Sequence, residues 1–124
     1  MRKIQTGSRY EALMGYSRAV VAGGQVHVSG CSGLPAEGGI GDAATQFALA
    51  VEKLGRILAE AGATLADVAR TRVYLTDPAD WDALVAAHGR AFGAIRPAST
   101  MVQVARLIDP RMRVELEADA VLPS

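Results

Sequence analysis

Few side chains in this sequence could carry out acid–base or nucleophilic chemistry, and none of them forms a strong motif. The chain has two histidines and one cysteine, which excludes a cysteine-rich zinc or iron–sulfur site, and the histidines are not at metal-ligand spacing. No serine lies in a nucleophile elbow, and the glycine-rich segment 38–41 lacks the Lys and Ser/Thr that engage a nucleotide phosphate. We therefore expect neither a cofactor nor a metal.

Arginines, glutamates and tyrosines are the remaining candidates for chemistry. Arg70 and Arg72 alternate with other residues in one segment, and Glu115 and Glu117 do so in another. Alternation of this kind places the side chains together on one face of a strand. Cofactor-free chemistry on a small molecule needs an anchor for substrate charge, a group that places a water and a partly dry cleft. Arg, Glu, Tyr and backbone amides are sufficient for these roles.

The histidines and the cysteine each have a structural interpretation that competes with a chemical one. His27 alternates with valines, so we expect its side chain to point to solvent. His88 falls within the apolar stripe of a predicted helix, where it is either a packed ring, which we favour, or a general base. Cys31 is interpreted first as a small buried side chain.

Length and charge limit the class of protein. A chain of 124 residues with 13 basic and 13 acidic side chains predicts one domain over residues 1–124 and no nucleic-acid partner, since binding to phosphates draws on clustered Lys and Arg. No apolar run approaches the roughly 18 residues of a membrane span, so we expect no membrane partner. The single cysteine fits a reducing compartment, and we expect a cytoplasmic protein.

Strands and helices must position these residues. Apolar alternation predicts five strands, over 17–22, 25–29, 67–76, 99–107 and 112–120. Helical spacing predicts two helices, over 43–61 and 78–92, and a loop is predicted over 30–41. The expected buried stripe of the second helix is Trp81, Leu84, Val85, His88 and Phe92. This order predicts the α/β (α+β) class, with a mixed sheet and both helices on one face. The other, charged face then meets water or another subunit, or pairs its charges across strands.

Five segments occur in order along nearly the whole chain: Gly15-Tyr16-Ser17-Arg18-Ala19-Val20, Val26-His27-Val28-Ser29-Gly30, Arg70-Thr71-Arg72-Val73-Tyr74-Leu75-Thr76-Asp77, Arg96-Pro97-Ala98 and Val114-Glu115-Leu116-Glu117-Ala118. Together they resemble the RidA (YjgF) family of reactive-intermediate deaminases, which hydrolyse enamines and imines to 2-keto acids and ammonia without a cofactor. The resemblance implies a chorismate-mutase-like homotrimer with an inner barrel of sheets, outer helices and ligand clefts between subunits. It also implies that Tyr16 contacts the ligand, Gly30 offers backbone groups and Glu117 orients a water.

One segment departs from the family pattern. Deaminating members read Pro-Ala-Arg-Ser where this chain reads Pro97-Ala98-Ser99-Thr100, and that arginine binds the substrate carboxylate. Ser99 cannot replace it, because a bidentate guanidinium–carboxylate pair is roughly twice as strong as a neutral hydrogen bond. Cys31 stands where the family usually has Gln. The candidate substrate-binding residues are therefore Gly30, Cys31, Ser99, Met101 and Arg96, the last of which reaches the ligand only from a turn.

Two functions follow from the resemblance and its departure. The first is a protein that binds a small polar metabolite between subunits and hydrolyses an imine or enamine at its C–N bond, anchored by Arg96 or by an arginine of a neighbouring subunit. The alternative is a non-catalytic ligand-binding or holdase-like trimer that lost deaminase activity with the anchoring arginine. Ribonuclease activity is the least favoured of the three functions, because the net charge is zero and no catalytic histidine pair is evident.

Overall fold

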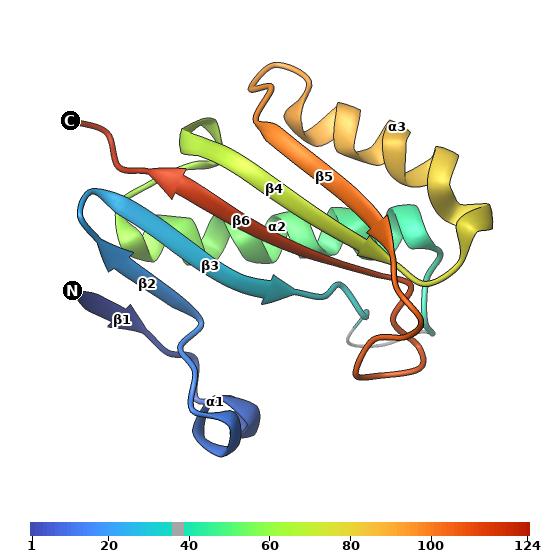
Figure 1. Ribbon diagram of the computed structural model, residues 1–124, viewed down its shortest axis with the longest axis horizontal. Helices are drawn as coiled ribbons and strands as arrows, with labels where there is room; N and C mark the ends of the chain where they lie inside the picture. Colours follow the sequence, from blue (N-terminus) through green and yellow to red (C-terminus); the bar gives the residue numbers. More distant parts are fainter. Residues whose placement is uncertain (36–38) are drawn as a thin grey trace.

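A six-stranded mixed sheet forms the centre of the computed structural model, which describes residues 1–35 and 39–124 (Figure 1). The strands are β1 (Arg2–Ile4), β2 (Ala19–Ala22), β3 (Gln25–Cys31), β4 (Val68–Leu75), β5 (Ala98–Gln103) and β6 (Val114–Val121). Their order is β1-β2-β3-β6-β4-β5, and every neighbouring pair is antiparallel except β4 and β5. Part of the predicted loop 30–41, namely residues 36–38, lies outside the described residues.

Helices α2 and α3 lie on the same side of this sheet, as predicted. The helical segments are α1 (Arg9–Met14), α2 (Ala43–Ala61), η1 (Leu65–Asp67), η2 (Pro78–Asp80) and α3 (Trp81–Phe92). The Asp42 carboxylate caps α2 by accepting from Thr45 N at 2.8 Å, and Gly62, with φ +89°, ends it. No helix in the described part of the chain has the length and apolarity needed to cross a membrane.

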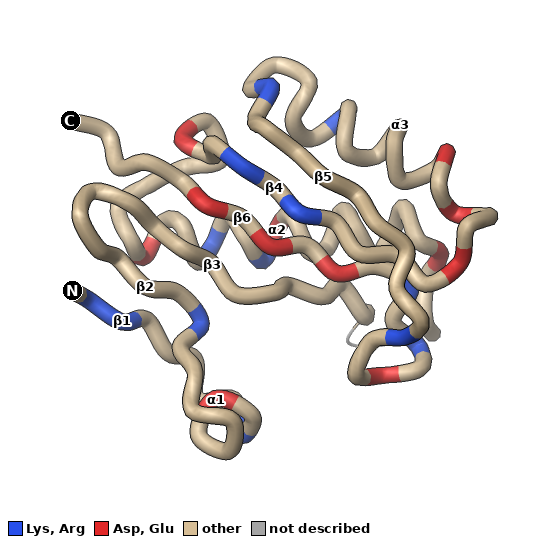
Figure 2. The backbone as a smooth tube through the Cα atoms, in the orientation of Figure 1, with Lys and Arg blue, Asp and Glu red and all other residues tan. Residues whose placement is uncertain are grey.

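Strand β6 has the clearest division between a buried and an open face. Val114, Leu116, Ala118 and Ala120 are at most 1% exposed and pack under the helices. The residues between them carry charge on the opposite side of the sheet, which we call the uncovered face. Figure 2 shows acidic positions along β6 beside basic positions along β4. The register pairs Arg72 with Glu117 and Arg70 with Asp119, so opposite charges meet across the two strands.

Several predicted elements differ from the structure. Strand β1 and helix α1 were not predicted, because three and six residues are too few for periodicity to be recognised. Strand β5 ends at Gln103 rather than residue 107, since its only neighbour is β4, and their pairing ends there. Trp81 and Val85 are 42% and 51% exposed, so the predicted stripe of α3 was too wide. The residues of α3 that are buried are Leu84, Ala87 and Phe92.

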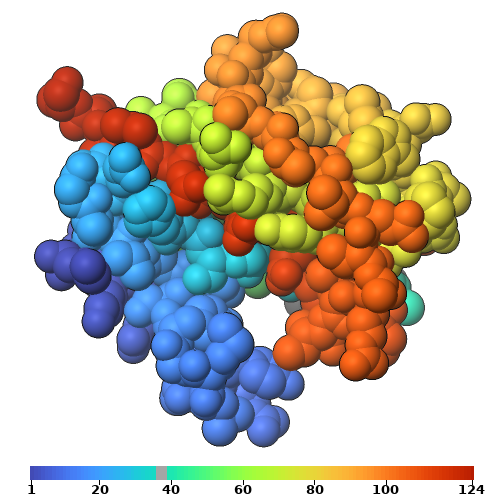
Figure 3. Space-filling model, in the orientation of Figure 1, coloured from blue at the N-terminus to red at the C-terminus, as the bar shows by residue number. Residues whose placement is uncertain are grey.

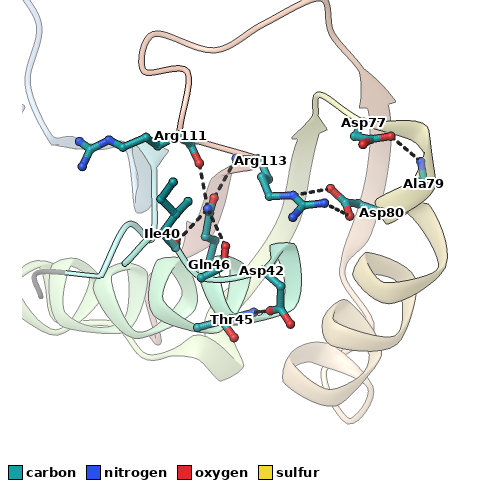
Figure 4. A network of polar contacts seen from close by, with 10 residues as sticks. Ile40, Asp42, Thr45, Gln46, Asp77, Ala79, Asp80, Arg111 and Arg113 are labelled. Carbon is teal, nitrogen blue, oxygen red and sulfur yellow. Dashed lines mark hydrogen bonds and ion pairs between the residues drawn. The ribbon is translucent and has the colours of Figure 1, made fainter. Parts of the chain in front are cut away.

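Gln46 is a fully buried polar side chain that ties three segments together (Figure 4). Its Nε2 donates to the carbonyls of Ile40 and Arg111 at 3.1 and 3.0 Å, and its Oε1 accepts from Arg113 N at 2.8 Å. The Arg113 guanidinium then makes a two-pronged ion pair with Asp80, at 2.9 and 2.7 Å. These bonds join the start of α2, the loop before it and the segment that enters β6.

Replacing Gln46 by Met, which has a similar shape, should lower the free energy of unfolding by about 3 kcal/mol, because buried carbonyls and an amide lose their partners. Urea denaturation measures the change. The exposed Gln25 offers a control: Gln25→Met should cost no more than about 0.5 kcal/mol. Equal, small losses in the two variants would contradict the clamping role of Gln46.

Candidate functional site

A pocket of about 410 Å³ opens on the uncovered face and brings together three of the predicted site residues. Tyr16 enters it from the segment before β2, Gly30 from the end of β3 and Glu117 from the middle of β6. Figure 3 shows the hollow between the N-terminal segment, in blue, and the loop before β6, in orange. Tyr10 of α1 and Ile108 of that loop border it. The pocket is therefore built from both ends of the chain.

Glu117 is held in place by its neighbours on β4. The Tyr74 hydroxyl donates to Glu117 Oε1 at 2.5 Å, and Arg72 Nη1 lies 3.9 Å from the same oxygen. The hydrogen bond to Glu117, together with burial, raises the pKa of Tyr74, so the phenol remains a donor. Arg72 also pairs with Asp119 at 3.2 Å, and Asp119 in turn contacts His27 at 2.8 Å. Glu117 is thus fixed at one oxygen at the centre of a charged network.

Glu115 lies in the same pocket in a different environment. Its side chain packs against Gly30, where an added Cβ would lie 2.7 Å from Glu115 Cδ, so this close approach favours glycine. Burial raises the pKa of Glu115, and the positive charge of Arg18 opposes that rise. The pocket therefore contains two carboxyl groups with unlike surroundings, as acid–base chemistry requires.

Arg18 supplies the positive charge of the pocket. Its Nη2 donates to the Gly30 carbonyl at 2.9 Å, and its guanidinium carbon lies 5.5 Å from the centre of the Tyr16 ring. Its Nε is buried and has no hydrogen-bond partner among the described residues. The guanidinium is thus positioned by two other residues of the pocket and retains unused donor capacity.

Ser99 and Met101 lie elsewhere in the protomer. They line a smaller pocket of about 230 Å³ on the helix-covered side of the sheet, together with His88 of α3. The Thr71 hydroxyl donates to Ser99 Oγ at 2.7 Å and is itself 2.8 Å from His88 Nε2. The His88 ring packs 4.8 Å from that of Phe92, and burial lowers the pKa of His88. His88 is therefore a packed ring, as favoured, and it lies on the opposite side of the sheet from the exposed His27.

Arg96 and Cys31 also lie outside the larger pocket. Arg96 is exposed in the turn between α3 and β5, where its φ of +58° is unusual for a residue other than glycine. Cys31 is fully buried, because its place on β3 opposite Leu116 directs it into the core, and burial raises the pKa of its thiol. Within one protomer the structure thus joins Tyr16, Gly30 and Glu117, and it separates them from these two residues.

Three residues of the site were not predicted as such: Arg18, Tyr74 and Glu115. Glu115 stands two residues from Glu117 on β6, where that spacing means the same face. Arg18 stands two residues from Tyr16, but outside any strand, so spacing alone did not reveal it. Tyr74 alternates with Arg72, but its contact with Glu117 follows from the pairing of β4 with β6, which no local pattern reveals.

Comparison with known proteins places the chain in a family. The family model described as Endoribonuclease L-PSP matches residues 6–122. A 2-iminobutanoate/2-iminopropanoate deaminase of Rattus norvegicus is 35% identical over 126 residues, covering 98% of this chain and 90% of the relative. The 3-aminoacrylate deaminase RutC of Acinetobacter baylyi is 34% identical over 111 residues, covering 87% of each protein.

Solved structures show the same fold. Rv2704 of Mycobacterium tuberculosis, a member of the YjgF/YER057c/UK114 family, superimposes with a TM-score of 0.89 at 45% identity, covering 98% of both chains. The YjgF gene product of E. coli superimposes with a TM-score of 0.80 at 27% identity, again covering 98% of both. In sequence and in fold, this chain belongs to the YjgF (RidA) family.

Proposed function

We propose that this protein hydrolyses a small imine or enamine to a carbonyl compound and ammonia, without a cofactor. The observation that carries the proposal is the convergence of Tyr16, Gly30 and Glu117 on one pocket, with Glu117 held by Tyr74 at 2.5 Å. Relatives named for deamination of 2-iminobutanoate, 2-iminopropanoate and 3-aminoacrylate support this reaction class.

The proposed reaction needs one water. The Glu117 carboxylate accepts a proton from that water while the water oxygen bonds to the imine carbon and the nitrogen takes up a proton, which gives a carbinolamine. The nitrogen then takes up a second proton, from Glu117, and the hydroxyl gives its proton to the Glu115 carboxylate. The carbonyl forms as the C–N bond breaks, ammonia leaves, and both glutamates return to their starting states. Glu115, whose pKa is raised by burial, is placed to deliver a proton to nitrogen. An enamine enters the sequence after it gains a proton at carbon and loses one from nitrogen, which converts it to the imine.

The anchor for an anionic substrate is Arg18 in this proposal, rather than Arg96. Arg18 lines the same pocket as Glu117 and Tyr16, and its Nε has no acceptor among the described residues. A guanidinium in a partly buried site can hold a carboxylate with charge-assisted hydrogen bonds. Ser99, where deaminating members have arginine, is already engaged by Thr71.

We also propose that the chain forms a homotrimer with its ligand clefts at the seams. Apolar residues that line the pocket are strongly exposed: Tyr10 by 49%, Met14 by 75% and Ile108 by 75%. Leu13, on the same helix as Tyr10 and Met14, is exposed by 69%. A neighbouring subunit would cover this surface. It would also bring its own Ser99 and Met101, which lie on the other side of the sheet, toward the pocket of this chain.

The alternative function is a non-catalytic ligand-binding or holdase-like trimer. The observation in its favour is Ser99, which occupies the anchoring position without charge and forms part of a hydroxyl–imidazole network with Thr71 and His88. A protein of this kind would keep the pocket and lose the reaction.

The trimer is tested by mass in solution. Size-exclusion chromatography with light scattering should give three times the 12.9 kDa of one chain at micromolar concentration. A stable monomer under these conditions would contradict the assembly, and with it the proposal that the clefts lie between subunits.

The reaction is tested at Glu117. Glu117→Gln keeps the shape and an acceptor for Tyr74 but cannot take a proton, so kcat for 2-iminopropanoate hydrolysis should fall by about 100-fold or more. The thermal midpoint should change little. Glu52→Gln, at an exposed position of α2, is the matched control and should retain full activity. Hydrolysis by Glu117→Gln at the wild-type rate would reject the proposed role.

The anchor is tested by Arg18→Gln and Ser99→Arg, with Ser99→Gln as the uncharged control. If Arg18 is the anchor, the wild type is active and Arg18→Gln lowers kcat/KM by about 10–100-fold, the scale of a lost hydrogen bond to a charged group. Ser99→Arg then changes kcat/KM by less than about threefold, well below that scale. Activity that appears only in Ser99→Arg would instead establish the non-catalytic alternative for the natural protein.

A further inference from the structure

A second pocket, of about 350 Å³, lies between α2 and the segment that follows β1. Its positively charged walls are Lys53 and Arg56 of α2 and Arg18 from the segment just before β2. One carboxylate, that of Glu60, also lines it. Lys53 and Arg56 stand three residues apart, which puts them on the same face of the helix. Three cations and one anion therefore surround a space that no described side chain fills.

These cations are not neutralised by ion pairs within the described residues. None of the ion pairs found in residues 1–35 and 39–124 includes Arg18, Lys53 or Arg56. Glu11, which lies near the pocket, has its two carboxylate oxygens engaged by Thr6 N and Thr6 Oγ1 at 2.9 and 2.5 Å. Arg18 acts on Glu11 and Glu115, and Lys53 on Glu115, only through space and without an ion pair, so the pocket keeps positive side chains that an external anion could contact.

The buried Nε of Arg18 is left without a hydrogen-bond partner in the described structure. Its exposed area is below 1 Å², and no acceptor in the described structure reaches it. A buried N–H without a partner costs free energy, and such groups are rare in folded proteins. Because Nε itself is shielded, an oxyanion with several acceptor oxygens would be held by Lys53, Arg56 and the terminal nitrogens of Arg18.

We propose that this pocket is a binding site for a small phosphate-class dianion, next to the proposed site of imine hydrolysis, with which it shares Arg18. The pocket is large enough for a phosphate and a small attached group. Arg18 lines both pockets, and its Nη2 donates to the Gly30 carbonyl at 2.9 Å. A bound anion would therefore be separated from the proposed reaction site only by the side chain of Arg18. The inference concerns binding alone and stands whether or not the protein hydrolyses imines.

Isothermal titration of the full chain with inorganic phosphate, at pH 7.5 and constant ionic strength maintained with sodium chloride, tests the site. The wild type should bind one phosphate per chain and gain thermal stability with increasing phosphate. The Lys53→Gln/Arg56→Gln double variant should bind at least about tenfold more weakly, since it loses two charge-assisted contacts. Arg90→Gln, at an exposed position in the last turn of α3, is the matched control and should bind as the wild type does.

Lys53 and Arg56 lie at the surface of α2, so the double variant should keep the circular dichroism spectrum of the wild type. The single variant Lys53→Gln should bind phosphate with an affinity between those of the wild type and the double variant, which gives a second test of the site. Absence of saturable phosphate binding by the wild type, or equal affinity in the double variant, would overturn the proposal. Tighter binding of glycerol 3-phosphate than of phosphate would identify a phosphorylated metabolite as the ligand, and tighter binding of phosphate would identify the free ion.

Discussion

The one-sided burial of β6 is the constraint on which the rest of this structure depends. β6 lies between β3 and β4, and its alternate residues Val114, Leu116, Ala118 and Ala120 fill the core beneath the helices. A shift of one residue in register would turn Glu115 and Glu117 into that core, where unpaired carboxylates are very unfavourable. Gln46 holds the entry of the strand through Arg113 N. The core thereby determines where the acidic residues of the uncovered face must stand.

The site uses the environment to distinguish two glutamates of the same strand. Glu117 meets Tyr74 and Arg72 across the strand pair, whereas Glu115 packs against Gly30, where burial raises its pKa. Residues two apart on a strand share a face but contact different neighbours, so the same side-chain type acquires two chemical characters. The pocket thereby offers two carboxyl groups in unlike surroundings for the proposed reaction.

The chain retains one part of the family pattern and has changed another. Tyr16, Gly30 and Glu117 occupy a common pocket, while Ser99, which the resemblance places at the anchoring position, is bonded to Thr71 beside His88. The basic side chain in the pocket is instead Arg18, which is joined to Gly30 through its carbonyl. The positive charge of this pocket therefore comes from the segment just before β2 rather than from β5.

Local patterns in the sequence determined the helices α2 and α3, most of the strands and the face on which each strand residue lies. They also placed Glu115 and Glu117 together, because alternation is a property of neighbouring residues. Only the tertiary structure decided that β6 inserts between β3 and β4, that Tyr16 and Gly30 meet a glutamate from the other end of the chain, and that Ser99 lies on the far side of the sheet. Strand order is set by how the apolar faces of segments distant in sequence pack against one another. The spacing of neighbouring residues carries no information about that packing.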